Sequence, residues 1–150
     1  MKTIPFAFAA AVAAFTGSAA LAVHAEPASL CAVVTAAEVQ SIVKEPVSSS
    51  KPLKYTRGCR YETASRGGGV TLNFLNTAGD GKAEFDGQKR LMAALKPQPV
   101  SGVGDEAVFG LVLVVRKGER VLMVEPQSLP ETQRREQAVA LARLALEKNQ

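Results

Sequence analysis

The sequence has no tryptophan and a single histidine, His24, which lies in an apolar segment at the start of the chain. Catalysis by a nucleophile, a histidine and an acid needs an imidazole to accept the proton. If this segment is removed, the remaining chain cannot carry that chemistry. Aromatic residues make up only 5% of the chain, and its basic residues are spread out. Nucleic-acid binders usually combine a dense basic stripe with aromatic side chains, so this class is disfavoured.

The first 25 residues have the order of a secretory signal peptide: a positive start at Lys2, an apolar run over residues 4–23, and the small or modest residues Val23-His24-Ala25. We expect cleavage after Ala25 and one secreted domain over residues 26–150. The alternative is a retained anchor, because an apolar run of about 20 residues can just span a bilayer. The interruption at Gly17-Ser18 favours cleavage.

Cys31 and Cys59 are the only cysteines. An even pair in an oxidising compartment is typical of a disulfide, here closing a loop of about 29 residues. A redox pair usually has the spacing Cys-x-x-Cys, and a structural zinc site needs about four ligands. The pattern therefore favours a structural disulfide in a periplasmic or secreted protein. The mature chain has 17 basic and 14 acidic residues, a mild net charge of +3.

Hydrophobic periodicity predicts the elements of the first half of the mature chain. Thr35 and Glu38 form a capping box, which predicts a helix over residues 36–44. Residues 48–52 are polar and end in proline, so we expect a loop. Residues 53–63 are expected to form a strand with Tyr55, Cys59 and Tyr61 on one face. A glycine-rich turn at residues 66–69 joins this strand to an alternating strand at 70–75.

An amphipathic pattern predicts a second helix over residues 82–95. Three strands follow, near residues 106–109, 111–115 and 121–124, and the last two form a hairpin with Gly118 at positive φ. Pro130 suits the first turn of a final helix to residue 147, buried across the sheet. The predicted fold class is α+β, a single antiparallel sheet packed by helices in the order α-β-β-α-β-β-β-α.

Two groups of residues stand out as candidate sites. Arg57, Arg60, Arg66 and Lys54 make the first hairpin basic, which fits an anionic partner; the alternative is a solvated, protected sheet edge. Gly104 and Asp105 lie before the strand at Glu106, and we expect them to shape its turn through side-chain to backbone hydrogen bonds. Asp105 and Glu106 are adjacent, so in a strand they point to opposite faces and do not suit paired acid–base work.

Other constellations favour structural roles. Ser48, Ser49 and Ser50 with Lys51 and Lys54 contain the residue types of a Ser-Lys dyad but fit a solvated loop. Asp80, Glu84 and Asp86 miss the calcium-loop spacing and fit a helix N-terminus. Gly102, Gly104 and Gly110 have no strand-turn-helix unit around them, so they do not suggest a dinucleotide site. We therefore predict no cofactor and no metal.

Short motifs cover most of the mature chain. They are Val34-Thr35-Ala36-Ala37-Glu38-Val39 after Cys31, then Cys59-Arg60-Tyr61, then Gly102-Val103-Gly104-Asp105-Glu106-Ala107, and an Ala/Leu helix at residues 138–146. This pattern resembles small secreted bacterial proteins and lipoproteins of unknown function. The resemblance implies a PsbP-like α/β sandwich used for binding or sensing at the cell envelope. The chain departs from the lipoprotein members because it lacks a lipobox before Cys31.

These observations lead us to expect a non-enzymatic periplasmic or secreted domain that binds a small ligand or a protein of the cell envelope. Nucleic acid and, after cleavage, a stable membrane anchor are not expected. The first alternative is a periplasmic inhibitor or immunity-type protein, which also needs only a surface. The second is a histidine-free enzyme that uses isolated carboxylates, or Tyr55 and Tyr61.

Overall fold

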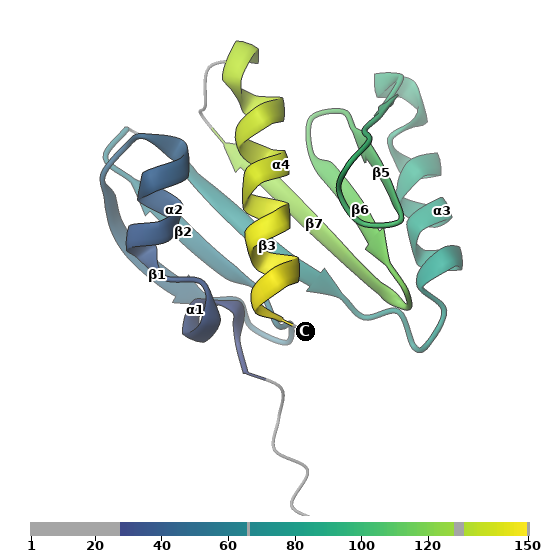
Figure 1. Cartoon of the computed structure of the whole chain (residues 1–150), viewed down its shortest axis with the longest axis horizontal. Coiled ribbons are helices and arrows are strands. Elements are labelled where there is room, and N and C mark those ends of the chain that lie inside the picture. The colour runs from purple at the N-terminus through teal and green to yellow at the C-terminus, as the bar shows by residue number, and fades with distance from the viewer. Residues whose placement is uncertain (1–27, 66, 128–130, 150) are drawn as a thin grey trace, which may run out of the picture.

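The computed structural model describes residues 28–65, 67–127 and 131–149. The signal segment, Arg66 and Pro130 lie outside the described residues. Seven strands form one antiparallel sheet in the order β1-β2-β3-β7-β6-β5-β4 (Figure 1). The strands are β1 (Val47–Pro52), β2 (Cys59–Thr63), β3 (Gly69–Leu75), β4 (Gln98–Pro99), β5 (Glu106–Phe109), β6 (Leu113–Lys117) and β7 (Arg120–Gln127).

The helices within the described residues are α1 (Leu30–Val33), α2 (Ala36–Val43), α3 (Gly81–Leu91), a 3-10 turn η1 (Ala93–Leu95) and α4 (Glu131–Lys148). The prediction of an α+β fold with one antiparallel sheet is confirmed. The predicted order of elements is wrong, because α1, β1 and β4 are additional. Strands β1 and β4 both end at a proline, and their strand geometry comes from pairing with β2 and β5 rather than from their own composition.

The segment before β2 also differs from the prediction. The strand expected over residues 53–63 begins only at Cys59, and residues 53–58 form the loop between β1 and β2. Tyr55 therefore does not share a face with Cys59 and Tyr61. Its side chain is 102% exposed and its φ is 64°, whereas Cys59 and Tyr61 are buried. Period-two counting fails at Tyr55 because the chain reverses there to pair β1 with β2.

The helix starts follow the sequence signals. In α2 the Thr35 side chain accepts from the Glu38 amide, and Glu38 accepts from the Thr35 amide at 2.9 Å, so the predicted capping box is present. In α3 Asp80 is the N-cap and accepts from the Ala83 amide at 2.8 Å. Each cap satisfies amides that have no partner within the helix.

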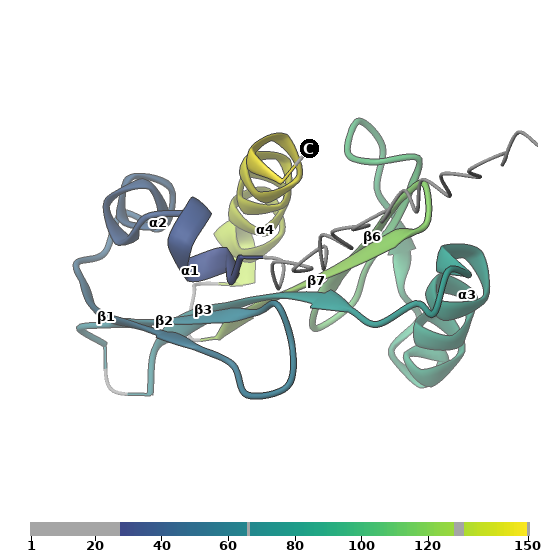
Figure 2. The same cartoon turned by 90° about the horizontal axis from the view of Figure 1, so that it is seen from below.

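The sheet has helices on both faces, as Figure 2 shows. On one face α1, α2 and α4 cover the sheet, and the main core lies between them, with Leu72, Leu122 and Leu141 fully buried. On the other face α3 packs through Phe85 on β5, β6 and β7. Strands β6 and β7 thus have helices on both sides, which explains why their residues are apolar on both faces.

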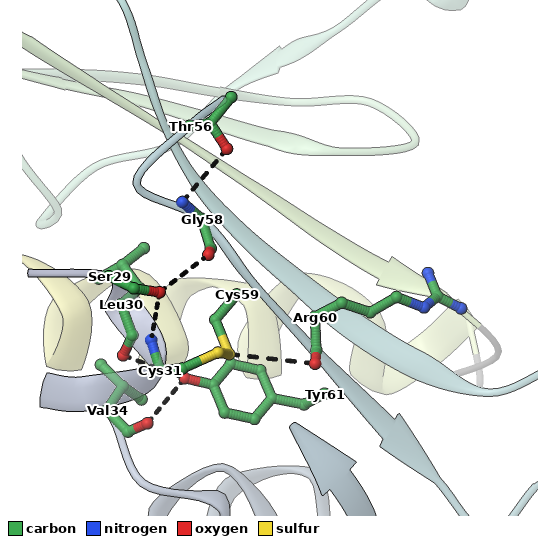
Figure 3. The surroundings of a disulfide bond; sticks show 9 residues. All are labelled: Ser29, Leu30, Cys31, Val34, Thr56, Gly58, Cys59, Arg60 and Tyr61. Carbon is green, nitrogen blue, oxygen red and sulfur yellow. Dashed lines mark hydrogen bonds between the residues drawn. A yellow bond between two sulfur atoms is a disulfide. The ribbon is translucent and has the colours of Figure 1, made fainter. Parts of the chain in front are cut away.

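The predicted disulfide is present: Cys31 in α1 is bonded to Cys59 at the start of β2 (Figure 3). The same region is closed by Tyr61, whose buried phenol donates to the Val34 carbonyl at 2.7 Å. Burial raises the pKa of Tyr61. The disulfide joins the short helix α1, rather than the start of α2, to the strand.

Candidate functional site

A hollow of about 660 Å³ opens at the end of the sheet where the β1–β2 loop, the end of β3 and the start of β7 meet. We call it the arginine hollow. Its volume is within the range of pockets that hold small molecules. Its lining consists of Ser29, Pro52, Leu53, Tyr55, Thr56, Arg57, Phe74, Leu75, Asn76, Thr77, Ala78, Gly79 and Arg120.

The β1–β2 loop forms one wall and is held at its base. The Leu53 amide donates to the Gly58 carbonyl at 3.0 Å, and the Leu30 amide donates to the Arg57 carbonyl at 3.1 Å. The Ser29 hydroxyl donates to the Gly58 carbonyl at 3.2 Å, directly beside the disulfide (Figure 3). Leu30 at the start of α1, its N-cap Ser29 and a bond within the loop therefore fix the wall, while Tyr55 is fully exposed to solvent.

Two non-glycine residues on the rim have a left-handed backbone. Tyr55 has a φ of 64° and Ala78 a φ of 48°. A side chain disfavours this conformation by roughly 1–2 kcal/mol, and such strain persists where the surrounding structure imposes it, often at functional sites. The rim of the hollow is thus shaped by tertiary contacts rather than by local preference.

Arg57 lies between the loop and the core. Its guanidinium carbon is 5.7 Å from the centre of the Phe74 ring, a cation–π distance. Its Nη2 donates to the Asn149 side-chain oxygen at 2.7 Å. Its Nε is buried and has no hydrogen-bond partner among the described residues. Arg57 thus has one neutral acceptor and an unsatisfied donor.

Arg120, at the start of β7, is the second guanidinium of the hollow. It is half-buried, and its Nη1 donates to the backbone carbonyl of Asn149. Neither Arg57 nor Arg120 forms an ion pair with a described carboxylate. No described acidic residue lines the hollow. The site therefore concentrates positive charge against an apolar floor.

The same two arginines have a structural role. Asn149 directly follows α4, and cationic side chains near a helix C-terminus stabilise it through its carbonyls and dipole. Arg57 and Arg120 hold this end of α4 on the sheet. This role uses one hydrogen bond from each guanidinium, to Asn149, and the buried Nε of Arg57 takes no part in it.

A second hollow, of about 580 Å³, shares Arg120 and lies along the last turns of α4. Arg143 donates through Nε to the Gly102 carbonyl at 3.1 Å and so holds the glycine-rich loop against the helix. The carboxylate of Glu147 lies in its lining, together with Lys117. This second hollow is therefore mixed in charge, unlike the arginine hollow.

The structure separates the residues predicted to form an anionic-partner surface. Arg57 lines the arginine hollow, and Lys54 is exposed in the neighbouring β1–β2 loop. Arg60 alternates with the buried Cys59 and Tyr61, so it lies on the opposite sheet face, where it donates to Gln127 at 3.0 Å. Arg66 lies outside the described residues. Sequence reasoning treated Arg120 only as part of a turn and did not single it out.

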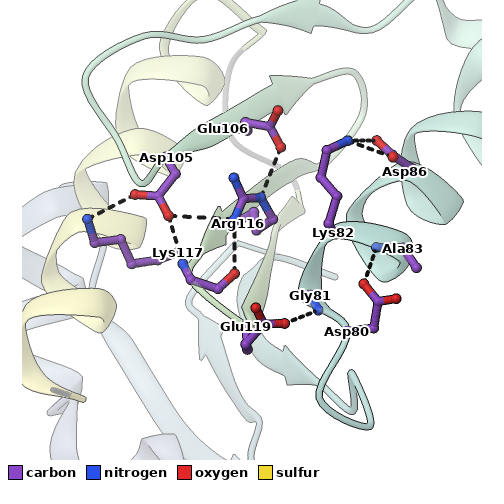
Figure 4. A network of polar contacts seen from close by, with 11 residues as sticks. Asp80, Gly81, Lys82, Ala83, Asp86, Asp105, Glu106, Arg116, Lys117 and Glu119 are labelled. Carbon is purple, nitrogen blue, oxygen red and sulfur yellow. Dashed lines mark hydrogen bonds and ion pairs between the residues drawn. The ribbon is translucent and has the colours of Figure 1, made fainter.

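Asp105 and Glu106 both reach Arg116 (Figure 4). Asp105 lies just before β5, so strand alternation does not separate it from Glu106. Its carboxylate also accepts from the Gly118 amide at 2.7 Å and pairs with Lys117 at 3.0 Å. The hydrogen bond from Gly118, reinforced by Lys117, lowers the pKa of Asp105. Asp105 therefore binds the β6–β7 turn to the chain before β5. The sequence predicted instead that Asp105 would shape the turn in which it lies.

Of the serine and lysine cluster expected in a loop, Ser48, Ser49, Ser50 and Lys51 lie in β1, and Lys54 lies in the β1–β2 loop. Ser49 donates to Glu62 at 2.7 Å and Lys51 pairs with Glu62 at 3.1 Å, so the hydroxyl and the amine meet a carboxylate on the open sheet face. In α3 Asp86 pairs with Lys82. The described part of the chain contains no group of three or more acidic, cysteine or histidine side chains that could hold a metal ion.

The chemistry that the arginine hollow offers is recognition of charge and shape. Hydroxyl groups of Ser29, Tyr55, Thr56 and Thr77 line it, and its described lining residues include no carboxylate, imidazole, thiol or amine. Searches against models of known protein families, curated proteins and solved structures each found no match. None of the described helices is long and apolar enough to cross a membrane.

Proposed function

We propose that this chain is a non-enzymatic binding domain that works in the periplasm or outside the cell and takes its ligand in the arginine hollow. The observation that carries the proposal is the pair of guanidinium groups, Arg57 and Arg120, in a hollow whose described lining has no acid. A few polar groups set over an apolar surface are typical of small-molecule sites.

The compartment is proposed from two features. Residues 1–25 have the order of a signal peptide, and the Cys31–Cys59 disulfide fits an oxidising environment. Export would leave a chain that begins at Glu26, which sequencing of the exported protein's amino terminus would establish. The resemblance to small secreted proteins with a PsbP-like sandwich, and the binding or sensing role that it implies, stay predictions.

A second candidate, an inhibitor or immunity-type protein, is supported by the β1–β2 loop. Tyr55 is fully exposed at the tip of a loop held at its base by backbone hydrogen bonds and followed by the disulfide. Rigidly presented tyrosines are common anchors in protein interfaces. This candidate predicts that the chain inhibits an enzyme of the cell envelope. The Tyr55→Ala variant should then fail to inhibit that enzyme.

The proposed site is tested by isotope-labelled NMR of residues 26–150 with a set of small neutral, cationic and anionic fragments. Amide shifts confined to residues 53–58, 75–79 and 120, produced by any fragment class, would support the hollow as the binding site. Shifts that fall elsewhere, or no shifts at millimolar fragment, would contradict it. Arg60→Gln is the matched control, because Arg60 lies on the opposite sheet face and its loss should leave the shifts unchanged.

A further inference from the structure

We propose, building on the proposed function, that the ligand of the arginine hollow is a small amphipathic anion. Its carboxylate or phosphate group would bind between Arg57 and Arg120, and its apolar body would lie against Phe74, on the sheet face that also carries the two arginines. The ligand class follows from the charge of the hollow, from the incomplete hydrogen bonding of its arginines, and from its apolar floor.

The charge of the hollow selects against cations. Two guanidinium groups face the hollow, and the partner that they share, Asn149, is neutral. Arginine has five donors in a fixed fork that matches an oxyanion at two points. An anion placed between Arg57 and Arg120 would therefore accept hydrogen bonds from both guanidinium groups and supply the negative charge that no described carboxylate gives them.

The unsatisfied donor of Arg57 points to the same conclusion. Nε is shielded from bulk water and has no partner among the described residues, which is uncommon for a buried donor. Since water cannot compensate this end of the guanidinium, its positive charge remains incompletely balanced in the free protein. The attraction for an anion at the exposed part of the same group is correspondingly stronger.

The apolar floor limits how polar the ligand can be. Leu53, Phe74 and Leu75 line the hollow, and of these Phe74 lies on the sheet face of the two arginines, so carbon atoms placed against it would be removed from water. The second hollow, beyond Arg120, mixes Lys117 and Arg143 with the carboxylate of Glu147, so the acid-free lining does not extend past the arginine hollow. One anionic group attached to an apolar body fits both observations.

The test compares two fluorescent probes that differ by one charged group, anilinonaphthalene sulfonate and its neutral parent phenylnaphthylamine. We expect the sulfonate to bind residues 26–150 about tenfold more tightly than the neutral probe, and Arg57→Gln or Arg120→Gln to remove most of that difference. Arg60→Gln, on the opposite sheet face, should retain it. Equal affinity of the two probes, or equal loss in Arg60→Gln, would overturn the proposal.

Substitution of either arginine also removes a hydrogen bond to Asn149 at the end of α4, so a further variant keeps both arginines. Asn76 lines the hollow, and its side-chain oxygen accepts from the Ala78 amide at 3.1 Å, a bond that an aspartate can also form. Asn76→Asp should therefore keep the loop, weaken the sulfonate probe about threefold or more by added negative charge, and leave the neutral probe unchanged. A sulfonate affinity equal to that of the parent protein would contradict the ligand class.

Displacement of the sulfonate probe by decanoate and by decyl phosphate then identifies the anionic group. Displacement by either competitor supports the proposal, and the one that displaces the probe at lower concentration shows whether the hollow prefers a carboxylate or a phosphate. Failure of both would overturn the ligand class. The two proposals can fail separately. If the NMR fragments shift the amide signals of the hollow residues but the neutral probe binds as tightly as the sulfonate, the proposed function stands and the anion preference fails. If neither probes nor fragments reach the hollow, the proposed function fails as well.

Discussion

At the scale of single residues, positive φ angles shape the turns next to both hollows. Gly104 has a φ of 61° and lies in the lining of the second hollow, and Gly118, with a φ of 59°, forms the β6–β7 turn. Both positions suit glycine by conformation, but their surroundings differ. A Cβ at Gly104 would lie 2.4 Å from the Arg116 carbonyl oxygen, whereas a Cβ at Gly118 would meet nothing within 4 Å.

This difference predicts unequal costs for two alanine substitutions. Gly118→Ala should lower the free energy of unfolding by about 1–2 kcal/mol, from backbone strain alone. Gly104→Ala adds a clash with backbone that cannot rotate away, and overpacking costs roughly 1–3 kcal/mol more. Urea unfolding of both variants measures the difference. Equal losses would show that the chain before β5 shifts freely to make room.

The residues of the candidate site were predictable only in part. Arg57 stood out in the sequence as one of several basic residues of the first hairpin, but nothing in its spacing separated it from Arg60. Arg120 followed a turn in an apolar hairpin and resembled an ordinary solvated residue. Their convergence depends on β7 pairing with β3 and on α4 ending above both strands, and local patterns do not contain these long-range contacts.

At the scale of elements, the packing of α2 beside α4 is fixed at the surface by Glu38. Its carboxylate pairs with Lys148 at the end of α4 and also caps α2 through Thr35. These contacts, the one to Lys148 first, lower the pKa of Glu38 from 4.5 to about 2. The side chains of Glu38 and Lys148 are each 34% exposed, so solvent screens the pair.

The lowered pKa predicts a pH dependence of stability with a definite sign. The contribution of Glu38 is fully present above pH 4.5 and is lost as the pH falls through about 2, because the unfolded chain takes up the proton first. Glu38→Gln can keep the cap and removes the charge, so it should lower the free energy of unfolding by about 0.5–1 kcal/mol near pH 6. Unfolding curves of parent and variant should converge near pH 2; a constant difference across that range would contradict the assignment.

The disulfide between α1 and β2 supports a second prediction at this scale. It closes a loop with a sequence separation of 28, for which chain entropy gives about 3–4 kcal/mol. Reduction, or Cys59→Ser, should therefore lower the melting temperature by roughly 10–20 °C for a domain of this size. Probe binding by the protein that remains folded should persist, since neither cysteine lines the hollow. An unchanged melting temperature on reduction would contradict this account of the bond.

The elements with strong periodicity were predictable and the edge strands were not. The α3 helix and the strand at residues 106–109 were expected close to where they lie, because their apolar residues recur at helical or strand spacing. Strand β1 has serines, a lysine and a proline, a composition typical of a loop. It becomes a strand because β2 offers a free edge, and its polar residues keep that new edge from pairing further.

At the scale of the whole molecule, the sheet is covered unequally and the candidate site lies at one end of it. Helices α1, α2 and α4 cover one face, and α3 covers only the β5–β7 half of the other. The arginine hollow draws on α1's leading residue Ser29, on the two loops that flank β2 and β3, and on β7. The single antiparallel sheet was predictable from the sequence, but this meeting of distant segments was not.

The central claim is that Arg57 and Arg120 form a binding site for an amphipathic anion. A crystal structure of residues 26–150 with anilinonaphthalene sulfonate tests it most directly. The account predicts sulfonate oxygens within hydrogen-bond distance of both guanidinium groups and the aromatic rings of the probe against Phe74. A probe bound elsewhere on the molecule, or bound in the hollow with its sulfonate turned away from both arginines, would contradict the claim.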